Sequence, residues 1–128
     1  MHLPATVRWC PVTRTGILEA VSGDTGVAIV LYERDSLTSV PHVVIQPDAA
    51  AAAARPASSM VMRWVRLGSD TALAMYRSTR GTVRLRITAE AASGDVNARL
   101  QSTSGTDSLV VTGTFRNLPV ATTAAGCT

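Results

Sequence analysis

Hydrophobic and polar residues alternate strictly between Thr82 and Thr88, which predicts a strand with one buried face. The same alternation returns from Asp95 to Gln101 and again from Leu109 to Phe115, where β-branched residues are frequent. The intervening stretches 92–94 and 102–106 are rich in Ser, Gly and Thr and predict turns. The last third of the chain is therefore expected to form a three-stranded antiparallel meander.

The register of the first two strands can be predicted by matching their apolar faces. We predict that Ile87 lies opposite Val96, because the inward residues of both strands then meet without a slip. The same register places Arg84 opposite Arg99. Like charges in this position are mildly destabilising, so the two side chains either separate into water or hold an anion between them.

Further short strands are predicted along the rest of the chain. They cover Thr6–Cys10, Gly16–Val21, Val27–Tyr32, Pro41–Pro47, Met60–Leu67 and Thr71–Arg77. The segment Val27–Tyr32 is apolar on both faces and is expected to be a central strand that is covered twice. With eight or nine short strands, the predicted fold is an all-β antiparallel β-sandwich, and the alternative is a closed antiparallel β-barrel.

The alanine-rich segment 48–56 interrupts the strand pattern. Asp48 can cap a helix through Ala49–Ala54, and Pro56 must end it. A helix of fewer than two turns is marginal in water, so the alternative is a flexible loop that joins two halves of the sheet. We expect residues 1–128 to form a single β domain that contains this loop or short helix.

The composition is that of a globular protein with modest charge. Hydrophobic residues make up 46% of the 128 residues and charged residues 16%, and the net charge is +3. All twelve basic residues are arginine. A net charge of +3 and only five aromatic residues argue against a nucleic-acid partner, which favours concentrated basic charge and exposed rings.

The second half of the chain carries most of the arginines that could share one sheet face. They are Arg63, Arg66, Arg77, Arg80, Arg84, Arg86 and Arg99. Arg84, Arg86 and Arg99 lie on the polar side of the predicted meander and are the candidate surface for an anion or a partner. The competing interpretation is a solvated strand face whose charge keeps the protein soluble and prevents pairing between molecules.

No catalytic, metal or cofactor site is predicted. Asp24-Thr25-Gly26 matches the catalytic tripeptide of aspartic proteases, but Ser22 and Gly23 precede it and indicate a hairpin turn. His2 and His42, the only histidines, have no metal ligand at a useful spacing, and the phosphate-loop and nucleophile-elbow motifs are absent. A hydrolase with scattered catalytic residues is the third functional hypothesis.

Three parts of the last third suggest a family resemblance. The runs Gly81–Thr88, Ser93–Ala98 and Val111–Phe115, followed by a cysteine near the end of the chain, resemble uncharacterised exported or lipoprotein β-domains of GC-rich bacteria. This resemblance implies an extracytoplasmic or cell-surface location and supplies no site residues, because no activity is established for such domains.

Cys10 and Cys127 are predicted to form a disulfide. Cys10 closes the first predicted strand and Cys127 lies just beyond the last one, and the ends of a domain are often close together. Two such thiols oxidise in an exported protein. Met1-His2-Leu3-Pro4 lacks the features of a signal peptide, so an export segment has been removed or the protein stays inside. No stretch reaches the roughly 18 apolar residues of a membrane helix.

These observations favour a non-catalytic, exported or surface-associated β module with a binding or structural role. The expected partner is a protein or a small ligand. The alternative is a small-ligand-binding barrel whose cavity is lined by small inward residues, namely Ala28, Ala72, Ala74, Ala98 and Gly113. A packed interior would exclude that alternative.

Overall fold

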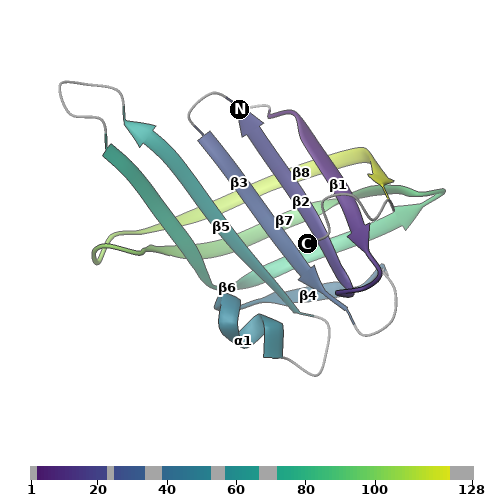
Figure 1. Cartoon of the computed structure of the whole chain (residues 1–128), viewed down its shortest axis with the longest axis horizontal. Helices are drawn as coiled ribbons and strands as arrows, with labels where there is room; N and C mark the ends of the chain where they lie inside the picture. The colour runs from purple at the N-terminus through teal and green to yellow at the C-terminus, as the bar shows by residue number, and fades with distance from the viewer. Residues whose placement is uncertain (1–2, 23–24, 34–38, 53–56, 67–71, 122–128) are drawn as a thin grey trace.

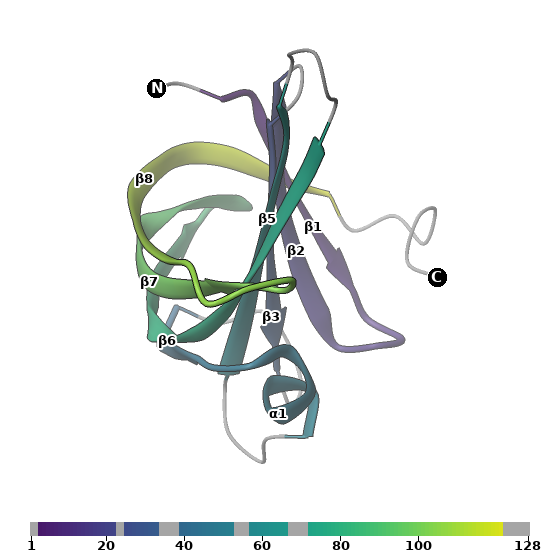
Figure 2. The same cartoon turned by 90° about the vertical axis from the view of Figure 1, so that its left-hand side faces the viewer.

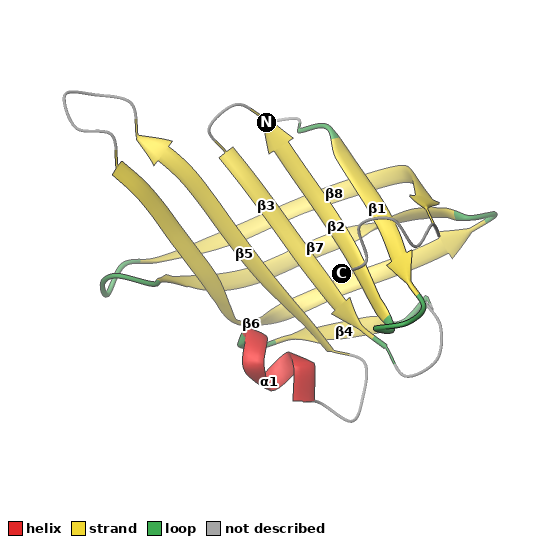
Figure 3. Ribbon diagram, in the orientation of Figure 1, coloured by secondary structure: helices red, strands yellow, loops and turns green. Residues whose placement is uncertain are grey.

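The computed structural model describes residues 3–22, 25–33, 39–52, 57–66 and 72–121, and these are almost entirely β (Figure 3). The strands are β1 (Ala5–Cys10), β2 (Thr15–Ser22), β3 (Thr25–Tyr32), β4 (Pro41–Val44), β5 (Ala57–Arg66), β6 (Ala72–Thr88), β7 (Ala91–Ser102) and β8 (Ser108–Ala121). One short helix, α1 (Pro47–Ala52), stands where the sequence left a choice between a loop and a helix. The predicted all-β class is confirmed.

The eight strands form one mixed sheet that is folded into two layers. The strand order is β1-β2-β3-β5-β4-β6-β7-β8, and β1 and β8 also pair, so the sheet closes on itself. Figures 1 and 2 show one layer that contains β1, β2, β3 and β5, and a second, strongly curved layer of β6, β7 and β8 that crosses it. The antiparallel prediction is mostly correct, because only the short β1–β8 and β4–β5 contacts are parallel.

Strand β6 belongs to both layers. On one edge, its first part pairs with β5 up to Arg77, and Gly81 to Arg84 then pair with β4. On the other edge, β7 pairs with β6 from Tyr76 onward. The change of partner coincides with a register shift between Ser78 and Arg80 and with a φ of 145° at Gly81. The sequence predicted separate strands at 71–77 and 82–88, but this bulge bends one strand without ending it.

The bend in β6 is held by the buried hydroxyl of Ser78. Its Oγ accepts a hydrogen bond from the backbone N–H of Met60 at 2.9 Å and donates one to the carbonyl oxygen of Ile45 at 2.7 Å. The hydroxyl therefore satisfies backbone groups of two other segments at the point where the regular ladder is interrupted.

The two layers enclose one hydrophobic core. It contains Val7, Leu18, Ile29, Leu31, Val44, Met60, Tyr76, Val83, Leu85, Ala92, Val96, Ala98 and Leu100. Every strand contributes to it or packs against it, so the alternation seen in the sequence describes a real inward face. Within the described ranges, the structure contains no helix with the length and apolar character that a membrane crossing requires.

The predicted register of the β6–β7 hairpin is wrong. Val83 pairs with Val96, and Arg84 pairs with Asp95 and not with Arg99. The turn is formed by Ala89 and Glu90, whose φ angles are 50° and 67°, while the predicted turn at 92–94 lies inside β7. Two consecutive residues with positive φ make the tight turn that suits a two-residue hairpin. The predicted pairing is displaced from the observed one by an even number of residues, so the same side chains still face inward.

Candidate functional site

The solvent side of the curved layer carries an orderly array of polar side chains, which we call the arginine face. Its residues are Arg80, Thr82, Arg84 and Arg86 of β6, Ser93, Asp95, Asn97 and Arg99 of β7, and Val110, Thr112, Thr114 and Arg116 of β8. All except the half-buried Ser93 are exposed. The pleat of the three strands produces this array, because every second residue of each strand faces water.

The three arginines predicted from the sequence, Arg84, Arg86 and Arg99, all lie on the arginine face. The structure places Arg80, one of the seven arginines considered from the sequence, on the same face, because β6 begins before the predicted start at Thr82. It also adds Arg116, which sequence reasoning missed because it ended the last strand at Phe115. Both follow the same alternation as their neighbours. Extending the last strand by one residue beyond Phe115 would have found Arg116.

Strand register determines which charges meet across the arginine face. Arg80 lies opposite Arg99, so the like-charge pair expected from the sequence exists with a different partner. Arg84 lies opposite Asp95. With five arginines and one aspartate, the formal charge of the face is 5 − 1 = +4.

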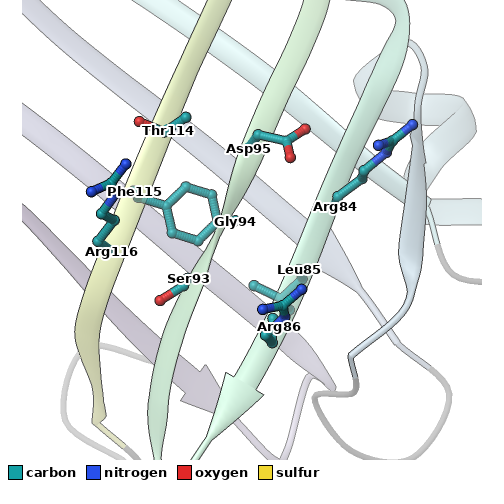
Figure 4. A pocket seen from close by; sticks show the side chains of 9 residues that line it. All are labelled: Arg84, Leu85, Arg86, Ser93, Gly94, Asp95, Thr114, Phe115 and Arg116. Carbon is teal, nitrogen blue, oxygen red and sulfur yellow. The ribbon is translucent and has the colours of Figure 1, made fainter.

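No salt bridge within the described part of the chain neutralises the arginines of this face. The two salt bridges found among the described residues are Arg8–Glu19 and His42–Glu33, and neither involves the arginine face. Even Arg84, which is opposite Asp95 in the ladder, forms no such bridge within the described residues; its side chain points away from that carboxylate in Figure 4. The guanidinium donors are therefore available to a ligand.

Two neighbouring hollows lie on the arginine face. The first has a volume of about 560 Å³ and is bordered by Arg80, Arg84 and Arg99, with Asn97 and Thr82 between them. The second has a volume of about 370 Å³ (Figure 4). Its basic residues are Arg84, Arg86 and Arg116, and it also contains Phe115. Arg84 and Asp95 border both hollows.

Gly94 shapes the second hollow. It pairs with Leu85 on one side and Phe115 on the other, and the bulge at Ala92–Gly94 is adjacent. A Cβ atom at this position would lie 2.0 Å from the carbonyl oxygen of Arg84 and 2.9 Å from the Phe115 ring. Only glycine fits, because a side chain here would collide with the backbone of β6 and with the Phe115 ring, which packs against the hydrophobic core.

A buried Glu33–His42 pair is a feature that the sequence did not reveal. His42 Nε2 lies 2.5 Å from Glu33 Oε1, and the two side chains are 0% and 2% exposed. His42 Nδ1 lies 2.9 Å from the carbonyl oxygen of Val40, so Nδ1 carries a proton, because a carbonyl oxygen only accepts. The other ring nitrogen, Nε2, forms the buried contact with Glu33 Oε1.

A cleft that joins a histidine to a carboxylate would support the third hypothesis, a hydrolase with scattered catalytic residues. The pair supplies both groups, but at this exposure a substrate cannot reach them. Neither hollow of the arginine face includes Glu33 or His42. The arrangement is that of a structural pair that joins the end of β3 to β4.

Several residues discussed from the sequence lie outside the described part of the chain, namely His2, Asp24 and Cys127. Ser22 pairs with Thr25, so only Gly23 and Asp24 connect β2 to β3. Cys10 is completely buried at the end of β1. The Cys10–Cys127 disulfide stays a prediction. Among the described residues, no three His, Cys, Asp or Glu side chains are grouped so that they could hold a metal ion.

The small inward residues proposed to line a ligand cavity do not share one environment. Ala98 is 1% exposed in the packed core, and Ala74 packs against that core. Ala28 is half-buried and Gly113 is exposed, while the Ala72 side chain lies outside the described part. The two hollows described above are on the outer side of the sheet, so the geometry favours a surface site.

Comparisons of the chain with protein-family models, with curated proteins and with solved structures give no significant match. The resemblance to exported β-domains therefore stays a prediction, and the function has to be argued from the surface itself.

Proposed function

We propose that this protein is a non-catalytic binding module whose arginine face binds an acidic segment of a partner protein. The observation that carries the proposal is the set of five arginines around two hollows, with no salt bridge to any described residue. Arginine is suited to this role because its planar guanidinium binds carboxylates through two parallel hydrogen bonds.

The opposed arginines in β6 and β7 support a binding role over a solvated face. Like charges directly opposite each other in a sheet are destabilising, and Arg80 and Arg99 occupy such positions. A bound carboxylate removes this repulsion. Asn97 and the threonines of the face add neutral hydrogen-bonding groups between the charges.

A protein partner is favoured over single-stranded nucleic acid by the side chains on this face. Single-strand binders stack bases on exposed rings. The exposed residues of the arginine face include no aromatic side chain, and Phe115 is half-buried. Carboxylates need charge and hydrogen bonds but no stacking platform, and these are what the face offers.

Binding of fluorescein-labelled poly-L-glutamate, followed by fluorescence anisotropy, tests the proposal. We expect the triple variant Arg84→Ser, Arg86→Ser, Arg99→Ser to bind at least about tenfold more weakly, and wild-type affinity to fall as salt is added. The matched control is Arg63→Ser, an exposed arginine on β5 in the other layer. Unchanged binding by the triple variant, or an equal loss in the control, contradicts the proposal.

We also propose that the protein is exported and that Cys10 and Cys127 form a disulfide. A bridge that closes a loop of this length restricts the unfolded chain by about 4 to 5 kcal/mol in the entropic model, which is an upper figure. The complete burial of Cys10 is compatible with a bridge. Mass spectrometry after alkylation without reductant is expected to find neither cysteine labelled in natively produced protein. Two labelled cysteines would refute both the bridge and the proposed location.

A further inference from the structure

We propose that the arginine face binds an extended peptide segment with two acidic side chains six residues apart, one for each hollow. This inference rests on the proposed binding function and specifies its ligand. It follows from how the charges are distributed along the strands.

The positive charge is concentrated at the two ends of the face. Arg80 and Arg99 lie opposite each other at one end. Arg86 and Arg116 border the second hollow at the other end, on either side of β7. Arg80 and Arg86 are six residues apart in β6, which corresponds to roughly 20 Å at a rise of about 3.3 Å per residue.

The middle of the face is close to neutral. Asp95 lies opposite Arg84 in the strand register, and the two residues border both hollows. Their opposite charges cancel, and the carboxylate of Asp95 lies between the two basic ends. Thr82 lies opposite Asn97, and Asn97 lies opposite Thr112 on β8. A ligand that is negative along its whole length would face repulsion from Asp95. A ligand that is acidic only at its ends would meet uncharged hydrogen-bonding groups in the middle.

An extended peptide matches this spacing. Six residues of extended chain span about 20 Å, and side chains at positions i and i+6 point to the same side because the strand period is two. A nucleic acid or a poly-acidic chain has charges at much shorter intervals and places some of them over Asp95. The geometry thus separates the proposed peptide from uniform polyanions.

The two ends differ in their apolar content. The hollow at Arg86 and Arg116 also includes Leu85 and Phe115, whereas the hollow at Arg80 and Arg99 includes Val110, which is 58% exposed. The exposed side chain of Val110, which lies opposite Arg99, can contact an apolar side chain next to the acidic one. We therefore expect one acidic residue of the peptide to have an apolar neighbour two positions away.

Synthetic peptides of equal composition test the inference. One carries two glutamates six positions apart, and the other carries them two positions apart, both within a serine and threonine chain labelled with fluorescein. The wild-type protein is expected to bind the first about tenfold more tightly in fluorescence anisotropy. Equal affinity for the two peptides would overturn the inference, while loss of binding to poly-L-glutamate in the arginine triple variant would still support the proposed function.

Variants of the two ends and of the middle provide the second measurement. Arg80→Ser with Arg99→Ser is expected to abolish the preference for the wider spacing, because only one basic end remains.

Asp95→Asn is expected to increase affinity for poly-L-glutamate severalfold and to leave the ranking of the two peptides unchanged. A decrease in poly-L-glutamate affinity in Asp95→Asn would contradict the role assigned to Asp95. If neither peptide nor poly-L-glutamate binds to wild-type protein, the proposed function fails together with the inference.

Discussion

Replacing Glu33 with alanine is expected to lower the free energy of unfolding by about 3 to 5 kcal/mol, as measured by urea denaturation. Glu33 Oε1 lies 2.5 Å from His42 Nε2, and the histidine side chain is fully buried. Without the carboxylate, Nε2 loses that partner in an environment where water cannot replace it. The pair also links the residue after β3 to β4, so its loss removes a contact between two strands that are not neighbours in the sheet.

The matched control is Glu19→Ala. Glu19 also forms an ion pair, because its Oε1 lies 3.1 Å from Arg8 Nη2, but the two side chains are 35% and 44% exposed. An exposed pair of this kind contributes about 0 to 1 kcal/mol. Similar losses in the two variants would show that burial does not determine the strength of the Glu33–His42 pair.

Gly81→Ala is expected to destabilise the protein by roughly 2 to 5 kcal/mol, because it combines backbone strain with a collision. Gly81 has a φ of 145°, which L side chains rarely adopt. A Cβ atom there would lie 2.2 Å from the carbonyl oxygen of Asn97 and 2.6 Å from the Cα atom of Ala98. Both are backbone atoms of β7, so no side-chain rearrangement relieves the contact.

Gly113→Ala is the control for this prediction. A Cβ atom at Gly113 would have only an ordinary contact of 3.8 Å with Val96 Cγ1. Thermal unfolding followed by circular dichroism is expected to give a midpoint close to that of the wild type or higher, since glycine weakens a strand. If both alanine variants unfold at the same temperature, the bend at Gly81 is not as tight as described.

The inward and outward faces of the strands were predictable from the sequence, but the pairing between strands was not. The alternation in 82–88 and 95–101 correctly separates buried Val83 from exposed Arg84. The register depends on the position of the turn. A turn with positive φ angles is usually indicated by asparagine or glycine, but here it is formed by Ala89 and Glu90. Ser93 and Gly94 look like a turn in the sequence, although they form a bulge within β7.

Only part of the candidate surface could be predicted, because the sequence indicates which residues share a strand face but not which residues lie opposite each other. Arg84, Arg86 and Arg99 could be placed on one face because that placement needs only the period of two. The opposition of Arg80 to Arg99 requires the register. The Glu33–His42 pair was missed because a polar connection and a proline-bounded strand gave no signal that two side chains nine positions apart would be buried together.

The arginine face is proposed to be the binding surface for the partner. The most direct test is to titrate ¹⁵N-labelled protein with the peptide that carries two glutamates six positions apart and to record backbone amide shifts by nuclear magnetic resonance. The shifts are expected to be concentrated at two groups of amides, around Arg80 and Arg99 and around Arg86 and Arg116, with little change in β1, β2 and β3. Shifts centred on β1, β2 and β3, or spread evenly over the whole chain, would contradict the proposal.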